Sequence, residues 1–349
     1  AAWLRGTLDQ QRLTLTFESD GQSKEEPLPE TCALLTGGAG DCEAASLQFA
    51  VLWIVRPQDI HFAPAGRFIF GKPLGKGQSS QVMEVTDTTT GRTDLAAKVS
   101  EGGKSHQELL QEAMVLKALN SSCRGFPEFI GLFADAERPD TRFMVLQRFR
   151  CSVEDLRREN PSMGGLGVVQ TVGMQVLSQL QAMHQLNLAH GDLKPKNIAV
   201  ASVNPLKISL IDFGCCRPFR VSGCWVRPRS KAAVGTTRFC AIPAHEGERS
   251  PRCDLESLAY VLIHLASGQL PWQGLGFLSK STREHSLQML GKKQDFALVE
   301  SHIRQNIPEA LANALTGMAW IPRNLAMDEE PPYMELRNLL QSAKPTETT

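Results

Sequence analysis

The feature that most constrains the fold of this chain is the order of its patterns, in which strands come before helices. Segments with strand character occupy much of residues 67–149, and helical spacing dominates after them. The predicted strands are 68–85, which has a glycine turn in its middle, 95–99 and 143–149. The predicted helices are 105–120, with Leu109, Ala113, Leu116 and Leu119 on one face, 168–185, 255–267, 307–320 and 333–342. This order predicts an α+β fold with a β-rich lobe, a helical lobe and a cleft between them.

Residues 1–66 differ from the rest of the chain and are predicted to form a small β-rich extension. Residues 13–17 alternate between apolar and polar side chains, as a half-buried strand does, and 47–55 is predicted to be a buried strand. Residues 21–30 are polar, contain two prolines and are predicted to be a loop. A hinge is expected at 64–66. The extension contains no chemical motif, so the role left open for it is the docking of a partner.

The charge balance and the apolar content exclude several classes of protein. Lys and Arg total 37 and Asp and Glu total 37, so the chain lacks the basic excess of a nucleic-acid-binding protein. The longest clean apolar run, 49–55, is far shorter than the roughly 18 residues that a membrane helix needs. No secretory signal opens the chain, and its nine cysteines include no C-x-x-C pair. We therefore expect an intracellular protein, cytoplasmic or nuclear, without disulfides, structural zinc or a membrane span.

Two features of the β-rich part suggest phosphate binding without deciding it. The turn from Gly75 to Val82 lies between two predicted strands, and glycines let a backbone pass close to phosphate oxygens. A plain glycine hairpin has the same pattern. Lys98 lies on the next predicted strand, where an inward-facing ammonium group needs a partner. Glu112, in the middle of a predicted helix, is the candidate partner, although a surface lysine and a solvated glutamate would look the same.

The most specific motif is the polar loop His190-Gly191-Asp192-Leu193-Lys194-Pro195-Lys196-Asn197, which follows a long predicted helix. Asp212-Phe213-Gly214 comes fifteen residues after Asn197, at the end of the apolar strand 208–211. An aspartate, a lysine two residues later and an asparagine five residues later can hold a hydroxyl, a phosphate and a metal ion together. A second aspartate at a strand end can bind Mg²⁺ from the other side. The order and spacing therefore predict phosphoryl transfer.

These motifs together resemble the signature set of protein kinases. The resemblance covers 67–342 and implies the bilobal protein-kinase fold, with an N-lobe at 67–146, a C-lobe at 150–342 and a tail at 343–349. The segments that resemble the casein kinase 1 group are 234–247, 252–258 and 268–272. Within that group, the tripeptide His190-Gly191-Asp192 and the segments 142–149 and 332–337 are similar to those of vaccinia-related kinases. The segments 226–229 and 268–272 are similar to those of tau-tubulin kinases.

The resemblance implies a catalytic role for several residues. Lys98, paired with Glu112, would bind the α- and β-phosphates of ATP. Asp192 would accept or orient the proton of the substrate hydroxyl, and Lys194 would neutralise the γ-phosphoryl group. Asp254 would support the loop that contains Asp192 from the helix below it, which is a structural role.

The resemblance also implies a nucleotide site. Asn197 and Asp212 would bind Mg²⁺. The residues expected around the ATP are Leu74, Gly75, Gly77, Val82 and Ala96, with Leu146 at the gatekeeper position and Gln147 to Phe149 as the hinge between the lobes.

The chain departs from the common kinase pattern at three places. Ser80 replaces the third glycine of the glycine turn, which predicts a modest cost in flexibility. Gly191 replaces the arginine that commonly reads a phosphate on the activation loop, so a switch of that kind is not expected. The glutamate of the A-P-E motif is absent, as the resemblance to the casein kinase 1 group implies.

The favoured function is a serine/threonine protein kinase that uses MgATP and acts on acidic or already phosphorylated protein substrates. Gly235-Thr236 and Lys194 favour a Ser or Thr hydroxyl over a tyrosine or a small molecule. Arg227, Arg229 and Lys231 form either an anion site for such substrates or a solvated basic loop. The main alternative is a pseudokinase or scaffold subunit of a larger assembly. A third class, a small-molecule phosphotransferase, has less support.

Overall fold

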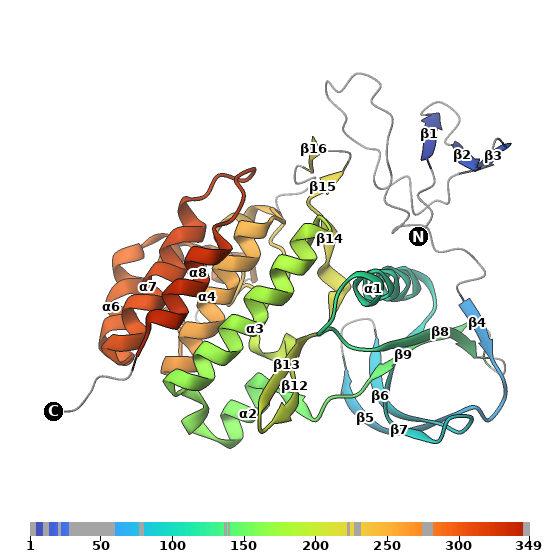
Figure 1. The fold of residues 1–349 in the computed structure, drawn as a ribbon, viewed down its shortest axis with the longest axis horizontal. Helices are drawn as coiled ribbons and strands as arrows, with labels where there is room; N and C mark the ends of the chain where they lie inside the picture. The colour runs from blue at the N-terminus through green and yellow to red at the C-terminus, as the bar shows by residue number, and fades with distance from the viewer. Residues whose placement is uncertain are drawn as a thin grey trace. The chain divides into compact units, whose positions relative to one another are not determined.

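The computed structural model describes residues 5–9, 14–19, 22–27, 60–76, 80–135, 138, 140–221, 224–226, 232–273 and 282–344 (Figure 1). They fall into two compact units. Unit 1 lies within Ala1–Ser122, Glu128–Arg148 and Arg220–Cys224, and unit 2 lies within Cys123–Pro127, Phe149–Phe219 and Trp225–Thr349. Along the sequence, the chain passes from unit 1 to unit 2 between Arg148 and Phe149, inside the predicted hinge.

Unit 1 is built on a six-stranded sheet with the strand order β4-β8-β9-β7-β6-β5. Its strands are β4 (Ile60–Ala63), β5 (Phe68–Lys76), β6 (Gln81–Asp87), β7 (Arg92–Glu101), β8 (Phe129–Asp135) and β9 (Thr141–Gln147). β4 pairs with β8 in parallel, and all other neighbours are antiparallel. The strands predicted at 68–85, 95–99 and 143–149 are thus confirmed. The division of the chain at residue 66 stays a prediction, although β4, on its N-terminal side, joins this sheet.

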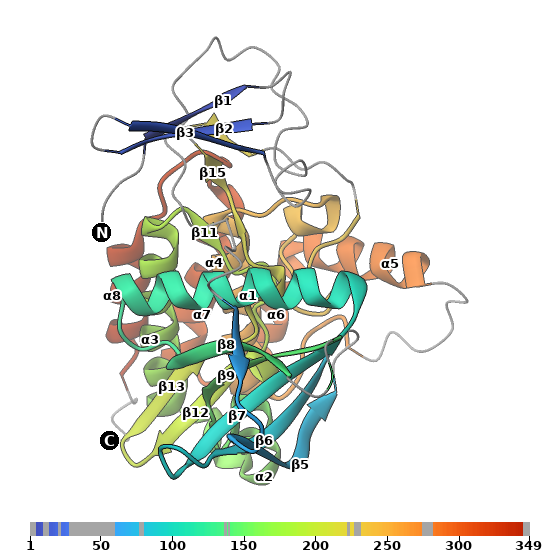
Figure 2. The same cartoon turned by 90° about the vertical axis from the view of Figure 1, so that its right-hand side faces the viewer.

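Helix α1 (Gly103–Ser122) packs against β7, β8 and β9, as Figure 2 shows. The apolar face predicted for this helix is buried: Leu109, Ala113, Leu116 and Leu119 are each at most 3% exposed. The sheet adds a cluster of buried apolar side chains, which are Ala63, Val85, Leu95, Ala97, Phe133, Phe143 and Val145. The spacing of apolar residues therefore explains why this helix forms and which side of it faces the sheet.

A separate three-stranded antiparallel sheet precedes unit 1's main sheet in sequence. It consists of β1 (Arg5–Asp9), β2 (Thr14–Ser19) and β3 (Gln22–Pro27) in that order. The strand predicted at 13–17 is confirmed as β2, but the loop predicted at 21–30 is wrong because β3 pairs with β2 there. Backbone hydrogen bonds suffice to hold a polar edge strand, and charged side chains are common on such edges. The strand predicted at 47–55 lies outside the described residues.

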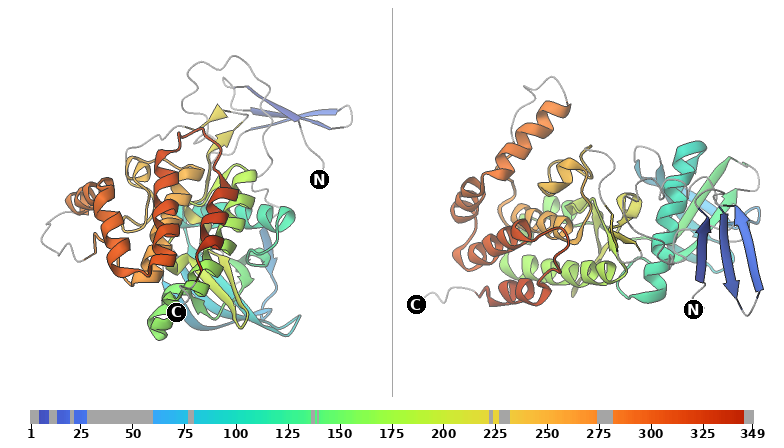
Figure 3. Two further views of the ribbon diagram at one scale, coloured as in Figure 1. Left: turned by 60° about the vertical axis from the view of Figure 1, so that its left-hand side comes forward. Right: turned by 90° about the horizontal axis from the view of Figure 1, so that it is seen from above.

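Unit 2 is mainly helical (Figure 3). Its helices are α2 (Val153–Glu159), α3 (Leu166–Gln185), α4 (Pro251–Ser267), α5 (Thr282–Gln294), α6 (Phe296–Asn306), α7 (Glu309–Asn324) and α8 (Tyr333–Ser342). The helices predicted at 168–185, 255–267, 307–320 and 333–342 are confirmed as α3, α4, α7 and α8. α4 packs against α3 and α7, and nearly all of its residues from Pro251 to Leu265 are buried. It is the central helix of the unit.

Local signals set the ends of several of these helices. Ser152 caps α2 in a capping box with Asp155, in which each side chain binds the other residue's backbone N–H. Asp295 caps α6 through the backbone N–H of Leu298. Gly268 ends α4 in a left-handed conformation, with φ of 84°, which glycine adopts at little cost.

Short strands and turns of 3₁₀ helix complete unit 2. β10 (Cys151–Ser152), β12 (Ile198–Val203) and β13 (Leu206–Leu210) form one small sheet, and β11 (Leu188–Ala189) pairs with β14 (Arg217–Pro218). The 3₁₀ turns are η3 (Pro161–Gly164), η4 (Pro195–Asn197), η5 (Phe213–Cys215) and η6 (Pro243–Glu246). β15 (Arg220–Val221), which belongs to unit 1, pairs with β16 (Cys224–Trp225), within which the chain returns to unit 2. The loop 190–197 thus follows β11, and Asp212 follows β13.

We expect Leu119→Ala to destabilise the protein, because the side chain of Leu119 on α1 is completely buried. Truncating a buried leucine costs about 2–5 kcal/mol of unfolding free energy. Ile69→Ala is the control, since Ile69 is 58% exposed on β5 and should lose about 0.5 kcal/mol or less. Urea denaturation of both variants measures the difference. Equal losses would contradict the packing described for α1.

Candidate active site

The loop 190–197 is held by Asp254, a buried carboxylate near the start of α4. Its Oδ2 accepts a hydrogen bond from the backbone N–H of His190 at 2.7 Å, and its Oδ1 accepts one from Gly191 at 2.9 Å. Nε2 of His184, on α3, lies 2.9 Å from Oδ2. Burial raises the pKa of Asp254, but the hydrogen bonds from His184 and Gly191 lower it, and the net pKa is below the usual value. The predicted structural role of Asp254 therefore has a geometric basis.

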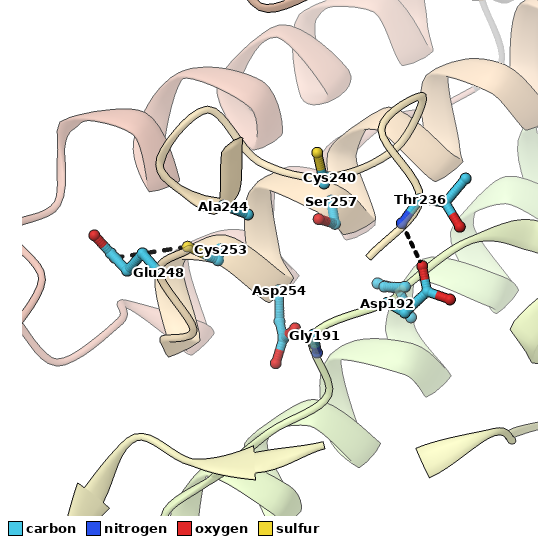
Figure 4. A pocket seen from close by; sticks show the side chains of 10 residues that line it. Gly191, Asp192, Thr236, Cys240, Ala244, Glu248, Cys253, Asp254 and Ser257 are labelled. Carbon is cyan, nitrogen blue, oxygen red and sulfur yellow. Dashed lines mark hydrogen bonds between the residues drawn. The ribbon is translucent and has the colours of Figure 1, made fainter. Parts of the chain in front are cut away.

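Figure 4 shows this region, with Asp254 beside Gly191 and with Asp192 facing Thr236. These residues line a small pocket of about 10 Å³ within unit 2. The ring of His190 is completely buried and connects two parts of the site. Its Nδ1 accepts from the backbone N–H of Asp192 at 3.3 Å, and its Nε2 donates to the carbonyl of Ile211 at 3.2 Å. The residue after Ile211 is Asp212, so one imidazole fixes the backbone beside both aspartates.

Asp192 has a hydrogen-bond partner at each of its carboxylate oxygens. Oδ2 accepts from Nζ of Lys194 at 2.5 Å and from Nδ2 of Asn197 at 3.3 Å. Oδ1 accepts from the backbone N–H of Thr236 at 2.6 Å. Nζ of Lys194 also donates to Oγ1 of Thr236 at 3.0 Å. The structure therefore brings together the three predicted residues of the loop 190–197, and adds Thr236 from a segment far away in sequence.

Two glycines allow the loop and the segment after it to approach each other. Gly191 has φ of 77°, and a Cβ atom on it would lie 3.0 Å from the carbonyl oxygen of Cys215. Gly235 has φ of 76°, and a Cβ atom on it would lie 2.5 Å from the carbonyl oxygen of Gly191. Both conformations strain any other residue. The glycine that replaces the common arginine at position 191 is thus demanded by the local backbone.

Asn197 and Asp212 are the candidate metal ligands, and the residue before Asp212 is hydrogen-bonded to the backbone of Asn197. The backbone N–H of Ile211 donates to the carbonyl of Asn197 at 2.9 Å. Nδ2 of Asn197 is used on Asp192, whereas its Oδ1 accepts no hydrogen bond from any residue that the structure describes. No group of three or more His, Cys, Asp or Glu in the described ranges could hold a metal ion. Mg²⁺ with a nucleotide needs only one or two protein oxygens, because phosphates and water supply the rest, so these residues fit it.

In unit 1, Lys98 and Glu112 form the predicted ion pair. Lys98 lies on β7 and Glu112 on α1, and Nζ and Oε2 are 2.5 Å apart. Glu112 is only 4% exposed, so the pair is shielded from water and stronger than a surface pair. The readings of a surface lysine and a solvated glutamate are therefore wrong.

Some of the other residues predicted around the nucleotide lie near this lysine on the sheet. Val82 on β6 is the register partner of Lys98 and also of Gly75 on β5. Ala96, two residues before Lys98, is buried and faces Leu146 on β9. Of the remaining predicted residues, Leu74 is 43% exposed, Gln147 and Phe149 are half-buried, and Gly77 lies outside the described residues.

Sequence reasoning missed His184 and Lys293, and it named His190 only as part of the motif, without a role. His184 and His190 are buried and polar, and His184 stands in the apolar part of α3, which was a signal that it has a specific partner. Lys293 is completely buried on α5, where the mostly polar sequence gives no sign of it.

Comparison with known proteins agrees with this geometry. A family model described as protein kinase domain matches residues 68–319. The chain belongs to the protein kinase family. It is also 33% identical over 229 residues to a probable serine/threonine-protein kinase of Dictyostelium discoideum, a match that covers 62% of this chain and 45% of that relative. The chain thus spans about half the length of this curated relative. Within the described part of this kinase, no helix is long and apolar enough to cross a membrane.

We expect Gly235→Ala to destabilise the kinase by about 2 kcal/mol or more, because it adds a left-handed penalty of about 1–2 kcal/mol to a backbone clash. Gly167→Ala is the control, since Gly167 lies in the first turn of α3 with open space around it. Thermal unfolding compares the two variants. Similar melting temperatures would contradict the close approach of Gly235 to Gly191.

Proposed function

We propose that this protein is a serine/threonine protein kinase that transfers the γ-phosphoryl group of ATP to protein substrates. The observation that supports this most strongly is the set of contacts at Asp192, which Lys194, Asn197 and Thr236 orient from three sides. Phosphoryl transfer needs little covalent chemistry from the enzyme and depends on positioning and on charge stabilisation. A fixed carboxylate beside a fixed ammonium group supplies both.

In this proposal most of the residues that bind the nucleotide belong to unit 1. Lys98, held by Glu112, binds the α- and β-phosphates, and an ammonium group already paired with a buried carboxylate needs no rearrangement to do so. The remaining nucleotide contacts come from Leu74, Gly75, Gly77, Val82, Ala96, Gln147 and Phe149. Most of these are apolar or backbone contacts, as is usual in nucleotide pockets.

The residues of unit 2 perform the transfer. Asp192 accepts the proton of the substrate hydroxyl as the oxygen attacks the γ-phosphorus and the bond to the β-phosphate oxygen breaks. Lys194 stabilises the charge on the transferred group. Asn197 and Asp212 would hold Mg²⁺, which when bound would neutralise the charge of the phosphates and orient them.

The acceptor and the subgroup are inferred from the sequence motifs and the relative. The Dictyostelium protein is described as a probable serine/threonine-protein kinase. Lys194 also contacts Thr236, and these two residues favoured a Ser or Thr hydroxyl as the acceptor in the sequence. The segments 234–247, 252–258 and 268–272 favour the casein kinase 1 group. We further propose acidic or already phosphorylated substrates, on the basis of the predicted basic cluster Arg227, Arg229 and Lys231, which lies outside the described residues.

We expect Lys98→Met, Asp192→Asn and Asp212→Asn each to lower turnover by ~10²-fold or more, the scale for removing one preorganised electrostatic contact. Radiolabelled phosphate transfer to casein measures turnover, and nucleotide binding is measured separately. Asp192→Asn should retain ATP binding, because Asp192 acts on the substrate hydroxyl.

Turnover that is the same in the wild-type protein and in all three variants would contradict the proposal. That result would favour the alternative function, a pseudokinase or scaffold subunit. Thermal unfolding of each variant shows whether a loss of turnover comes from a loss of folded protein.

The substrate preference has its own test. Arg227→Ala with Arg229→Ala should raise KM for an acidic or phosphorylated peptide and leave KM for ATP unchanged, since planar guanidinium groups bind phosphate in a bidentate manner. The effect should weaken at higher salt, because exposed charges are screened over about 8–10 Å. An unchanged preference for acidic over neutral peptides would assign the cluster to a solvated loop.

A further inference from the structure

Lys293, near the C-terminal end of α5, has a completely buried side chain. Its Nζ donates hydrogen bonds to the carbonyl oxygens of Thr237 and Cys240, each at 2.6 Å. Nζ also lies 3.2 Å from Nε2 of His245. All three partners belong to the segment 236–245, so one ammonium group binds both the beginning and the end of this segment.

Two aromatic rings complete the surroundings of Lys293. Nζ lies 5.4 Å from the ring centroid of Tyr260 and 5.3 Å from that of Trp272, distances at which a ring face attracts a cation. Trp272 also donates its indole N–H to the carbonyl of Arg238 at 2.8 Å. Among the described residues, no carboxylate oxygen forms an ion pair with Nζ. The charge is therefore balanced by backbone carbonyls, by the rings and, without direct contact, by the charge of Glu256.

This arrangement is costly for the stability of the fold. A buried ammonium group without a carboxylate partner loses its hydration, and burial lowers the pKa of Lys293 to about 8. An apolar side chain of similar length would avoid that cost. The benefit of a lysine here must therefore lie in the groups that it holds.

His245 gives the second contact between α5 and this segment. Burial, followed by the charge of Lys293, lowers the pKa of His245 to about 4, so the ring is neutral near neutral pH. Its Nε2 can then accept from Lys293, while its Nδ1 lies 3.1 Å from Oγ of Ser286, which is also on α5. Two side chains of one helix thus hold the end of the segment.

The beginning of the segment is part of the candidate active site. Thr236, whose backbone N–H donates to Asp192, directly precedes Thr237, whose carbonyl accepts from Lys293. We propose that Lys293 is a positioning residue, which fixes the segment 236–245 so that Thr236 holds Asp192 in the orientation that receives the substrate hydroxyl. This inference rests on the proposed kinase function and adds a residue far from the sequence motifs to it.

The test compares Lys293→Met with Lys292→Met, since Lys292 is the exposed neighbour on the same helix. Lys293→Gln is a milder variant, which keeps N–H donors but removes the charge and shortens the reach. Hydrogen exchange of the full chain reports on the amides of 236–245, and steady-state kinetics with casein and ATP reports on catalysis. Thermal unfolding shows that each variant is folded.

We expect faster exchange in the segment 236–245 for Lys293→Met, an intermediate effect for Lys293→Gln and none for Lys292→Met. We also expect kcat/KM for casein to fall by about 10-fold or more, because small misplacements of catalytic groups cost up to ~10²-fold. KM for ATP should stay unchanged, since the residues proposed to bind the nucleotide lie outside the segment 236–245 in the sequence.

Two outcomes would overturn the inference. One is unchanged exchange in 236–245, and the other is an equal loss of apparent affinity for casein and ATP, as a general weakening of the fold would give. The exchange measurement needs no enzymatic activity. If the wild-type protein transfers no phosphate, the proposed function is contradicted. The exchange measurement would still show whether Lys293 positions the segment 236–245.

Discussion

The carboxylate of Asp254 is the interaction on which the geometry of the site depends. It is buried in the central helix of unit 2 and accepts hydrogen bonds from two consecutive backbone amides of the loop 190–197. A buried carboxylate is tolerated only when its oxygens are satisfied, and two adjacent N–H groups fix both the position and the direction of the chain. Asp192 follows immediately after these amides, so they fix the backbone from which its side chain extends.

The same helix supports the second half of the site through Glu256. This residue is also buried, and burial raises its pKa. Its Oε2 accepts from the backbone N–H of Ile242 at 3.1 Å, and its Oε1 accepts from Tyr260 and lies 3.3 Å from Nε of Arg323. Asp254 and Glu256 are two residues apart, and one binds the loop 190–197 while the other binds the segment 236–245. The distance between these two loops is therefore set by a single rigid helix.

The sequence predicted those parts of the fold and the site that depend on local pattern. The buried face of α1 follows from the spacing of Leu109, Leu116 and their neighbours, and the pair Lys98–Glu112 follows from the need of a buried ammonium for a partner.

Elements without such a pattern were missed. The apolar run of β8 is interrupted by Gly131 and is ambiguous between strand and helix, and α5 is too polar to show a period. The contacts of Thr236 with Asp192 and of Lys293 with Thr237 join residues 44 and 56 positions apart, and no local signal encodes such a distance.

Buried charges hold the two loops in addition to the apolar cluster of Cys240, Ala241, Ala244 and Cys253, because the backbone groups of a loop need polar partners. A loop near a catalytic group has backbone N–H and C=O groups outside any helix or sheet, and each of these must find a partner. Apolar side chains can pack against such a loop, but they cannot form hydrogen bonds with its backbone N–H and C=O groups. Asp254 and Glu256 present acceptors to amides, and Lys293 presents donors to carbonyls, so the three charges match the polarity of the backbone groups they meet. Burying each of these charges costs free energy of folding. In unit 2 the three charges lie at the loops whose positions determine the position of Asp192.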